Sequence, residues 1–333
     1  MQTKIKLIDE LLTKSMFSGS LLIAEKDQIL ISKGYAFSDY EFDIPNTENT
    51  LFRIASITKQ MTAAAIMQLI EKKKLNLNDT LNQFIEDYPN GDKITIYHLL
   101  TNSSGIANFE LESDFYDVYH AKSFDEALIN LFKFEPLLFK PGSQFSYSIS
   151  GYLLLGYIIK KVSGMLYEDY LDKHLFKPLK MNHSGFDHWR KIVKQRAKNY
   201  DFIDEQIVHA EFLDMRIAGA GGGLYSTTGD LFLWQQGLLN NTIMNEESYQ
   251  MMFTPQIMIN EYVSYGYGAF LAKAVIVDKM RRKNYHTGGG PGVRSMHTYY
   301  PDDQITFILT SNINDRNTFN QTEEKIEEIL LSK

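Results

Sequence analysis

Hydrophobic residues near the start of the chain recur first at helical spacing and then in two short runs. Ile5, Ile8, Leu11 and Leu12 fall on one face of a helix, because positions three and four apart share a face. The runs that follow are "SLLIAE" and "QILISKGYA", separated by the turn-like residues 26–27. Two apolar runs joined by a turn are typical of an antiparallel hairpin. We therefore predict a short amphipathic helix followed by a β-hairpin.

The pattern changes twice along the rest of the chain. From about residue 58 to about residue 189 it is mostly helical, with loops at "YPNGD", "TNSSG" and "KPGS". After about residue 214 a glycine run, "GAGGG", is expected to form a turn, and one more helix follows it. Four apolar or aromatic runs then read as strands: "YGYGAFLAK", "AVIVD", "VRSMHTYY" and "QITFILTSN". The chain closes with a helix whose apolar face carries Ile326, Ile329 and Leu330.

These elements predict an α+β fold with two lobes in a single domain over residues 1–333. The early hairpin and the late strands can share one antiparallel sheet, with the terminal helices lying on it. Residues 1–57 and 214–333 would form this sheet lobe, and residues 58–213 a helical lobe inserted between its halves. Binding sites are commonly found in a cleft between such lobes.

Composition and charge exclude several classes of function. The 333 residues have a net charge of -7 and no long basic stretch, whereas a nucleic-acid binder needs a concentrated positive face. The chain has no cysteine, which removes thiolate nucleophiles, disulfides and iron–sulfur clusters. No apolar run is long enough for a membrane span, and the first residues lack a secretory leader. As written, the chain is expected in the cytoplasm, or in the periplasm or outside the cell if a leader was removed.

Ser56 and Lys59 are the first residues that suggest chemistry. If a helix begins near Ser56, positions i and i+3 share a face, so the lysine can act as base for the serine. The apolar neighbours would lower the pKa of the lysine ammonium by burial. A helix N-cap serine followed by a solvated lysine is the ordinary alternative.

Two further stretches carry candidate residues. Tyr147 follows a Pro-Gly loop and precedes an apolar helix, although an aromatic packing residue would also fit there. The run "YHTGGGPGVRS" places His286 and Thr287 on a strand that ends in glycines, which let a ligand approach the backbone. Its alternative is a glycine-rich hairpin with an incidental histidine.

In this order, the three motifs resemble those of the serine β-lactamase and penicillin-binding protein superfamily, closest to its class C-like branch of DD-peptidases, D-aminopeptidases and esterases. That superfamily carries S-x-x-K, then Y-x-N, then K-T-G or H-x-G. Separated segments such as "PNTENTLFRIASITKQMTAAAIMQLI", "LLFKPGSQFSYSISGYLLLG" and "GAGGGLYSTTGDLFLW" also read like that family. The resemblance extends over nearly the whole chain.

The resemblance implies a β-lactamase/transpeptidase-like fold and a role for each matching residue. Ser56 would attack an acyl carbonyl, while Lys59 and Tyr147 would move the proton. The backbone N–H groups of Ser56 and Gly289 would form the oxyanion hole. The remaining substrate-binding positions would be His286, Thr287, Gly288 and Ile149.

Two positions depart from the family pattern. Ile149 stands where most members carry the asparagine of Y-x-N, whose amide touches the catalytic lysine and the substrate acylamide. We therefore expect the loss of this amide to slow the hydrolysis of peptides and β-lactams more than that of simple esters. Asn102 stands where the family usually has a histidine, and we interpret this difference as structural. With His286 in place of lysine, binding of a substrate carboxylate should weaken as pH rises through the titration of the histidine.

Other mechanisms find less support in the sequence. No G-x-S-x-G elbow is present for a Ser-His-Asp hydrolase, and no H-E-x-x-H or G-x-G-x-x-G motif for a metal or a nucleotide. We therefore expect no cofactor and no metal, and a small substrate such as an ester, a D-amino-acid peptide or a β-lactam. A non-catalytic sensor that binds peptidoglycan fragments or β-lactams is the alternative function. The oligomeric state is left open.

Overall fold

The computed structural model describes residues 1–109, 115–277 and 279–332. Its main sheet has eight strands in the order β10-β11-β12-β13-β14-β15-β1-β2, all paired antiparallel. These strands are β1 (Gly19–Glu25), β2 (Gln28–Tyr35), β10 (Ile257–Met258), β11 (Val263–Tyr265), β12 (Phe270–Ile276), β13 (Lys279–Gly290), β14 (Val293–Tyr300) and β15 (Ile305–Ser311). The early hairpin β1–β2 therefore joins the late strands through β15, as the sequence pattern predicts.

The remaining described elements are helices and short strands. The helices are α1 (Gln2–Lys14), α2 (Thr58–Glu71), α3 (Ile96–Leu100), α4 (Tyr116–His120), α5 (Phe124–Asn130), α6 (Ile149–Ser163), α7 (Tyr167–Leu171), α8 (Lys177–Leu179), α9 (Met215–Gly222), α10 (Thr228–Leu239), α11 (Glu246–Met252) and α12 (Arg316–Leu331), with single turns η1 (Ala55–Ile57), η2 (Leu81–Gln83) and η3 (Asp172–Phe176). The short strands are β3 (Phe37–Asp39), β4 (Ile44–Pro45), β5 (Phe52–Arg53), β6 (Gly185–Phe186), β7 (Tyr200–Ile203), β8 (Gln206–His209), β9 (Leu224–Ser226) and β16 (Ile313–Asn314).

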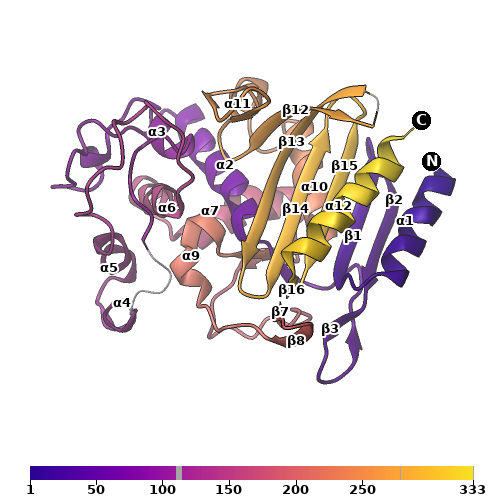
Figure 1. Ribbon diagram of the computed structural model, residues 1–333. Helices are drawn as coiled ribbons and strands as arrows, with labels where there is room; N and C mark the ends of the chain where they lie inside the picture. The colour runs from indigo at the N-terminus through magenta and orange to yellow at the C-terminus, as the bar shows by residue number, and fades with distance from the viewer. Residues whose placement is uncertain (110–114, 278, 333) are drawn as a thin grey trace.

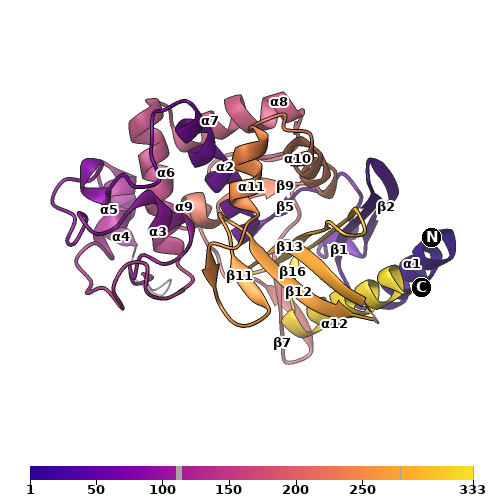
Figure 2. The ribbon, with the colours of Figure 1, turned by 90° about the horizontal axis from the view of Figure 1, so that it is seen from above.

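The central strands of the sheet are buried on both faces. Leu21 and Ile23 of β1 pack with α1 and α12, whereas Leu22 and Ala24 belong to the core on the opposite face. Side chains alternate between the faces of a strand, so a run that is apolar at every position serves two cores. Figures 1 and 2 show α1 and α12 side by side on one face of the sheet, with both chain ends close together.

Helix α2 lies in the middle of the molecule, between the sheet and the helices drawn at the left of Figure 1. Every residue from Thr58 to Leu69 is buried, including Lys59, Gln60 and Gln68. A helix that is apolar around most of its circumference needs such an enclosed position. The polar residues on it therefore have partners inside the protein: Gln60 accepts a hydrogen bond from the Trp234 indole, 3.1 Å away.

Two predictions of local structure are wrong. The run "GAGGG" is not a turn, since Met215–Gly222 forms the helix α9, kinked at Gly219 with φ 46°. The runs "YGYGAFLAK" and "AVIVD" do not form two strands, because Phe270–Ile276 is continuous as β12.

Among the described residues, no single helix is long and apolar enough to cross a membrane. Helix α6 passes that test only when joined to the helical segment Tyr167–Leu179, and the two meet at a bend of 73°.

Candidate active site

Ser56 and Lys59 lie at the junction between η1 and α2. Ser56 is in the 3₁₀ turn and Lys59 in the first turn of the α-helix, rather than both being in one α-helix. In a 3₁₀ turn the residues i and i+3 are nearly eclipsed, which brings Lys59 Nζ to 3.1 Å from Ser56 Oγ. Ala55, directly before the serine, has φ 43°, a left-handed conformation that side chains other than glycine rarely adopt. Backbone strain of this kind is concentrated at functional sites.

Lys59 is completely buried, with a relative exposure of 0%. Its Nζ donates a hydrogen bond to the Gly221 carbonyl oxygen, 2.7 Å away, and lies 4.7 Å from the centre of the Tyr147 ring. Because burial penalises the ammonium form, the pKa of Lys59 falls to about 7. A large fraction of this lysine is then a free amine at neutral pH, which a general base requires.

Tyr147 lies in the loop directly before α6 and faces the same serine. The nearby Ser56 hydroxyl lowers the pKa of the phenol, because it favours the phenolate form. Burial is the larger effect and raises the pKa of Tyr147 well above its usual value, so the side chain stays a neutral phenol. Tyr147 can therefore donate or relay a proton, while Lys59 is the better acceptor.

Two asparagines hold the loop that carries Tyr147. The Asn102 side-chain oxygen accepts a hydrogen bond from the Ser148 N–H at 3.1 Å, and its backbone oxygen accepts one from the Ser146 N–H at 2.9 Å. The Asn108 side-chain oxygen accepts from the Ile149 N–H at 2.7 Å, and its amide donates to the Tyr147 carbonyl at 3.2 Å. These contacts give Asn102 the structural role that its departure from the family pattern suggested.

The third motif lies on β13, whose close packing on η1 depends on a glycine. A Cβ atom on Gly288 would lie 2.4 Å from the Ile54 carbonyl oxygen and 3.0 Å from the Ala55 Cβ, so only glycine allows this approach. Gly288 therefore allows β13 to pack against η1, the turn that carries Ser56, while Gly289, next along the strand, is exposed. Strand β12 pairs with β13 only as far as Tyr285. Residues 286–290 of β13 pair with β14 on one side, but on the other side, where β12 would continue, they have no strand partner among the described residues.

His286 differs from what the sequence predicted. The side chain is 1% exposed; its Nδ1 donates to the Thr287 carbonyl oxygen at 2.7 Å, and its Nε2 lies 3.3 Å from the Tyr265 hydroxyl, which must be the donor. Burial, with Lys59 nearby, lowers the pKa of His286 to about 3. The expected carboxylate binding by a protonated His286 is therefore not supported, because the ring is neutral and both nitrogens are occupied. Thr287, next to it, is exposed.

Ile149 is the first residue of α6 and lies beside Lys59. A Cβ placed on Gly221 would lie 3.1 Å from Ile149 Cγ2 and 3.5 Å from Lys59 Nζ, so both side chains flank the same glycine. An asparagine here would offer an amide beside Lys59, whereas isoleucine offers only methyl groups.

The structure thus brings together Ser56, Lys59 and Tyr147, with β13 beside them. Sequence reasoning missed Asn108, the Gly221 carbonyl and Tyr265, because no local motif marks them and each meets its partner only after folding. Among the residues that the structure describes, no group of three or more His, Cys, Asp or Glu side chains is placed to hold a metal ion.

Comparison with known proteins identifies the family and the fold of the chain. The model of the Beta-lactamase family matches residues 5–330. The chain is 30% identical over 315 residues to PbpX of Bacillus subtilis (strain 168), named as a penicillin-binding protein, covering 94% of this chain and 75% of that one. It is 28% identical to the teichoic acid D-alanine hydrolase of Staphylococcus aureus, over 94% of this chain and 75% of that protein.

A solved structure has the same fold. The crystal structure of a penicillin-binding protein from Bacillus halodurans superposes with a TM-score of 0.83, at 27% identity, over 96% of this chain and 98% of that one. The family match over almost the whole sequence and the shared fold lead to one conclusion: the chain belongs to the Beta-lactamase family, within the serine β-lactamase and transpeptidase superfamily.

Proposed function

We propose that this β-lactamase-family serine hydrolase works through a covalent acyl-enzyme on Ser56 and cleaves esters in preference to amides and β-lactams. The observation that carries the proposal is the fully buried Lys59 amine, 3.1 Å from Ser56 Oγ, with its pKa lowered to about 7. A buried amine beside a hydroxyl is suited to removing the hydroxyl proton.

The proposed reaction has two steps. In acylation, Ser56 Oγ bonds to the substrate carbonyl carbon as its proton passes to Lys59, and the oxyanion is held by the N–H groups of Ser56 and Gly289. The bond to the leaving group then breaks as the Tyr147 phenol donates its proton to the departing oxygen and is reprotonated from Lys59. In deacylation, water attacks the carbonyl carbon of the ester on Ser56 and gives one proton to the same pair of side chains. The pair passes this proton to Ser56 Oγ as the ester bond breaks, which releases the acid and restores the serine hydroxyl.

The preference for esters follows from Ile149. A hydrogen bond to a charged group is worth roughly 1.5–3 kcal/mol, or about ten- to a hundredfold in rate when it acts in the transition state. An amide substrate of this family carries an acylamide group, and Ile149 cannot give that group the hydrogen bond that an asparagine would supply. An amide also has a poorer leaving group than an ester. A simple ester has no acylamide group and loses little.

The names of the relatives support an acyl-transfer reaction without fixing the bond that is cleaved. One relative is named as a penicillin-binding protein and another as a D-alanine hydrolase. A sensor that only binds such compounds would not need a lysine with a lowered pKa beside its serine. The two functions therefore differ in whether Ser56 becomes acylated, which an experiment can measure.

Mass spectrometry tests the proposal directly. Incubation with a p-nitrophenyl ester of a short acid should add the acyl group to the peptide that contains Ser56, and Ser56→Ala should remove both the adduct and the turnover. A folded protein whose Ser56 stays unmodified by esters and by a fluorescent β-lactam would overturn the acyl-enzyme.

The ester preference has its own measurement. The ratio kcat/KM for p-nitrophenyl esters of short acids should exceed that for cephalosporins by about tenfold or more. Equal efficiency on both classes would refute the role assigned to Ile149.

A further inference from the structure

The last turn of α9 meets α2 through two consecutive backbone carbonyls. The Ala220 carbonyl oxygen accepts a hydrogen bond from Thr62 Oγ1 at 2.7 Å, and the Gly221 carbonyl oxygen accepts one from Lys59 Nζ at 2.7 Å. Lys59 and Thr62 are three residues apart on α2, so their side chains lie on one face of that helix. The last carbonyls of a helix have no partner within it, and here two side chains of α2 supply one each.

A buried tyrosine continues this chain of hydrogen bonds. Tyr167, on α7, places its hydroxyl 2.7 Å from Thr62 Oγ1. The Thr62 hydroxyl has one hydrogen, and its nearer carbonyl acceptor is that of Ala220, since the Thr58 carbonyl is 3.3 Å away. The Tyr167 hydroxyl must therefore donate to Thr62, and burial raises the pKa of this phenol well above its usual value, so it keeps its proton.

The backbone of α9 depends on such contacts at this point. Gly219, directly before Ala220, has φ 46° and ψ -133°, so the helix is not regular there. Ala220 is also packed closely against α6, because a Cβ on Gly156 would lie 2.5 Å from the Ala220 Cβ. The contact with α6 and the hydrogen bond from Thr62 thus fix the backbone directly before the Gly221 carbonyl.

We propose that Thr62 and Tyr167 are positioning residues of the Ser56 centre: their hydrogen bonds hold the end of α9 so that the Gly221 carbonyl keeps the Lys59 amine within reach of Ser56 Oγ. That amine has the Gly221 carbonyl oxygen at 2.7 Å and Ser56 Oγ at 3.1 Å as its hydrogen-bond partners among the described residues. A shift of the carbonyl therefore turns the amine away from the serine. This inference rests on the proposed function, in which Lys59 removes the serine proton.

The same carbonyl stabilises the charged form of the lysine. An ammonium group gains more from a carbonyl oxygen than a neutral amine does, so loss of this contact should lower the pKa of Lys59 further. The titratable side chains that the structure describes around this amine do not titrate near pH 7, because burial keeps His286 neutral and keeps Tyr147 and Tyr152 as phenols. The midpoint of the pH–rate profile therefore reports on the Gly221 contact.

Thr62→Val removes the hydroxyl and keeps the shape of the side chain. We expect kcat/KM for p-nitrophenyl acetate to fall by about tenfold, chiefly through kcat, because a misplaced base slows the reaction of bound substrate. The midpoint of the pH–rate profile should also move below that of the unmodified protein. Tyr167→Phe leaves Thr62 able to donate to Ala220, so it should give a smaller loss of about threefold, with a shift in the same direction.

Two control variants separate positioning from a general loss of stability. Thr62→Ser keeps the hydroxyl and should retain most of the activity and the original midpoint. Tyr170→Phe, also on α7, removes a buried phenol that donates to Gln68 of α2 at 3.3 Å, about 14 Å along the helix from Lys59. This second control should change neither kcat/KM nor the midpoint.

Three results would overturn the positioning role: normal kcat/KM and midpoint in folded Thr62→Val, a loss of rate with an unmoved midpoint, or an equal loss in Tyr170→Phe. If Thr62→Val does not fold, Tyr167→Phe decides, because its midpoint must still move. A failure of the proposed function is distinct from these results, since the unmodified protein would then not be acylated at Ser56 by p-nitrophenyl acetate.

Discussion

The Lys59 side chain is fully buried and keeps its amine within reach of the Ser56 hydroxyl. Burial lowers the pKa of this lysine to about 7, so that much of it is a neutral amine at neutral pH, as a general base requires. We therefore predict that kcat/KM for an ester rises with pH through about 7, the pKa of Lys59, and levels off above it. The value of kcat/KM should rise with pH because only the neutral amine can accept the serine proton, and the fraction of neutral amine grows as pH rises.

A pH–rate profile between pH 5 and 9 provides the measurement. Lys59→Arg, which cannot lose its proton, should remove most of the activity at every pH, by about a hundredfold or more. A profile that is flat from pH 5 to 8 would contradict the role of this lysine as the base.

Ile149 is the residue at which substrate choice should be adjustable. Replacing Ile149 by Asn places an amide beside Lys59 and should raise turnover of an amide or a cephalosporin by about tenfold or more, with a smaller change for esters. Ile149→Val keeps the position apolar and is the control. Parallel changes of ester and amide turnover in Ile149→Asn would show that the side chain does not discriminate between them.

At the scale of elements, the site depends on a loop and a helix start that Asn108 joins. Its side chain accepts from the Ile149 and Ser150 N–H groups at 2.7 and 3.4 Å and donates to the Tyr147 carbonyl. Asn108→Ala should lower the free energy of unfolding by about 1 kcal/mol, as loss of a helix cap does. It should also lower kcat/KM by about tenfold through a displaced Tyr147.

Asn108→Asp separates positioning from chemistry. The carboxylate keeps the acceptor for the two N–H groups at the positive end of α6 but loses the N–H that donates to the Tyr147 carbonyl, so stability should return while only part of the activity does. Kinetics and chemical denaturation of the two variants give the comparison. An Asn108→Ala protein with normal turnover would show that Asn102 and Ser148 suffice to hold the loop.

The elements differ in how well the sequence predicts them. The terminal helices and the early hairpin follow from spacing, because one face of each meets a core and the apolar period records it. The glycines in and directly after α9 misled the prediction, since they allow close packing. A Cβ on Gly221, within the helix, or on Gly223, at its end, would lie within 3.1 Å of neighbouring atoms. The first half of β13, "KMRRKNY", is missed because its charged side chains pair with α12 and the loop after β14.

The residues of the candidate site also differ in how well the sequence predicts them. The S-x-x-K turn, Tyr147 and the glycines of β13 are local patterns in a recognisable order, so the sequence indicates them. The state of His286 depends on its burial and on the hydrogen bond from Tyr265, which is brought beside it by folding. Contacts between residues far apart in the chain leave no mark in a single sequence.

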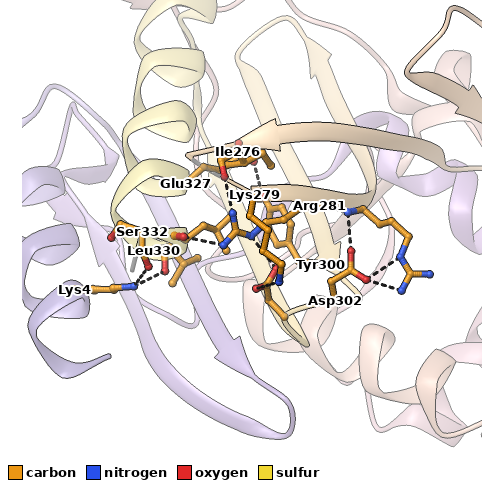
Figure 3. Close-up of polar contacts among 12 residues, drawn as sticks. Lys4, Ile276, Lys279, Arg281, Tyr300, Asp302, Glu327, Leu330 and Ser332 are labelled. Atoms are coloured by element: carbon orange, nitrogen blue, oxygen red, sulfur yellow. Dashed lines mark hydrogen bonds and ion pairs between the residues drawn. The ribbon is translucent and has the colours of Figure 1, made fainter.

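At the scale of the whole molecule, the two chain ends are fastened to the sheet near each other. Figure 3 shows Arg281 and Lys4 at the last turn of α12. Arg281 donates to the Leu331 carbonyl at 2.9 Å, to the Ile276 carbonyl at 2.5 Å and to Asp303 at 3.0 Å, while Lys4 donates to the carbonyls of Leu330 and Ser332. Cationic side chains at the free carbonyls of a helix end stabilise that end.

Arg281→Met should destabilise the fold much more than the same change at its neighbour. Arg281 is buried, and its loss leaves two carbonyls without their donor and Asp303 with only the more distant Lys279, 3.7 Å away. We expect this to lower the free energy of unfolding by about 3 kcal/mol. Arg282 pairs with Asp302 at the surface, so Arg282→Met should cost about 0–1 kcal/mol. Urea denaturation measures both, and similar losses would show that burial does not set the strength of this contact.

Two buried histidines on adjacent strands make stability depend on pH. His286 and His297 face each other across β13 and β14, and burial lowers their pKa values to about 3 and about 4. Both therefore bind protons on unfolding below pH 6.5, so their contribution to stability is present above that pH and is lost as pH falls. Between pH 7 and pH 5 each histidine should reduce the free energy of unfolding by about 2 kcal/mol.

His297 allows this linkage to be tested apart from catalysis. Neither of its ring nitrogens has a hydrogen-bond partner among the described residues, so an apolar replacement leaves no protein group unsatisfied. His297→Leu should raise stability at pH 5 relative to pH 7 by about 2 kcal/mol. Urea unfolding at the two pH values gives the difference, and an unaltered slope in His297→Leu would mean that this histidine keeps its proton equilibrium on folding.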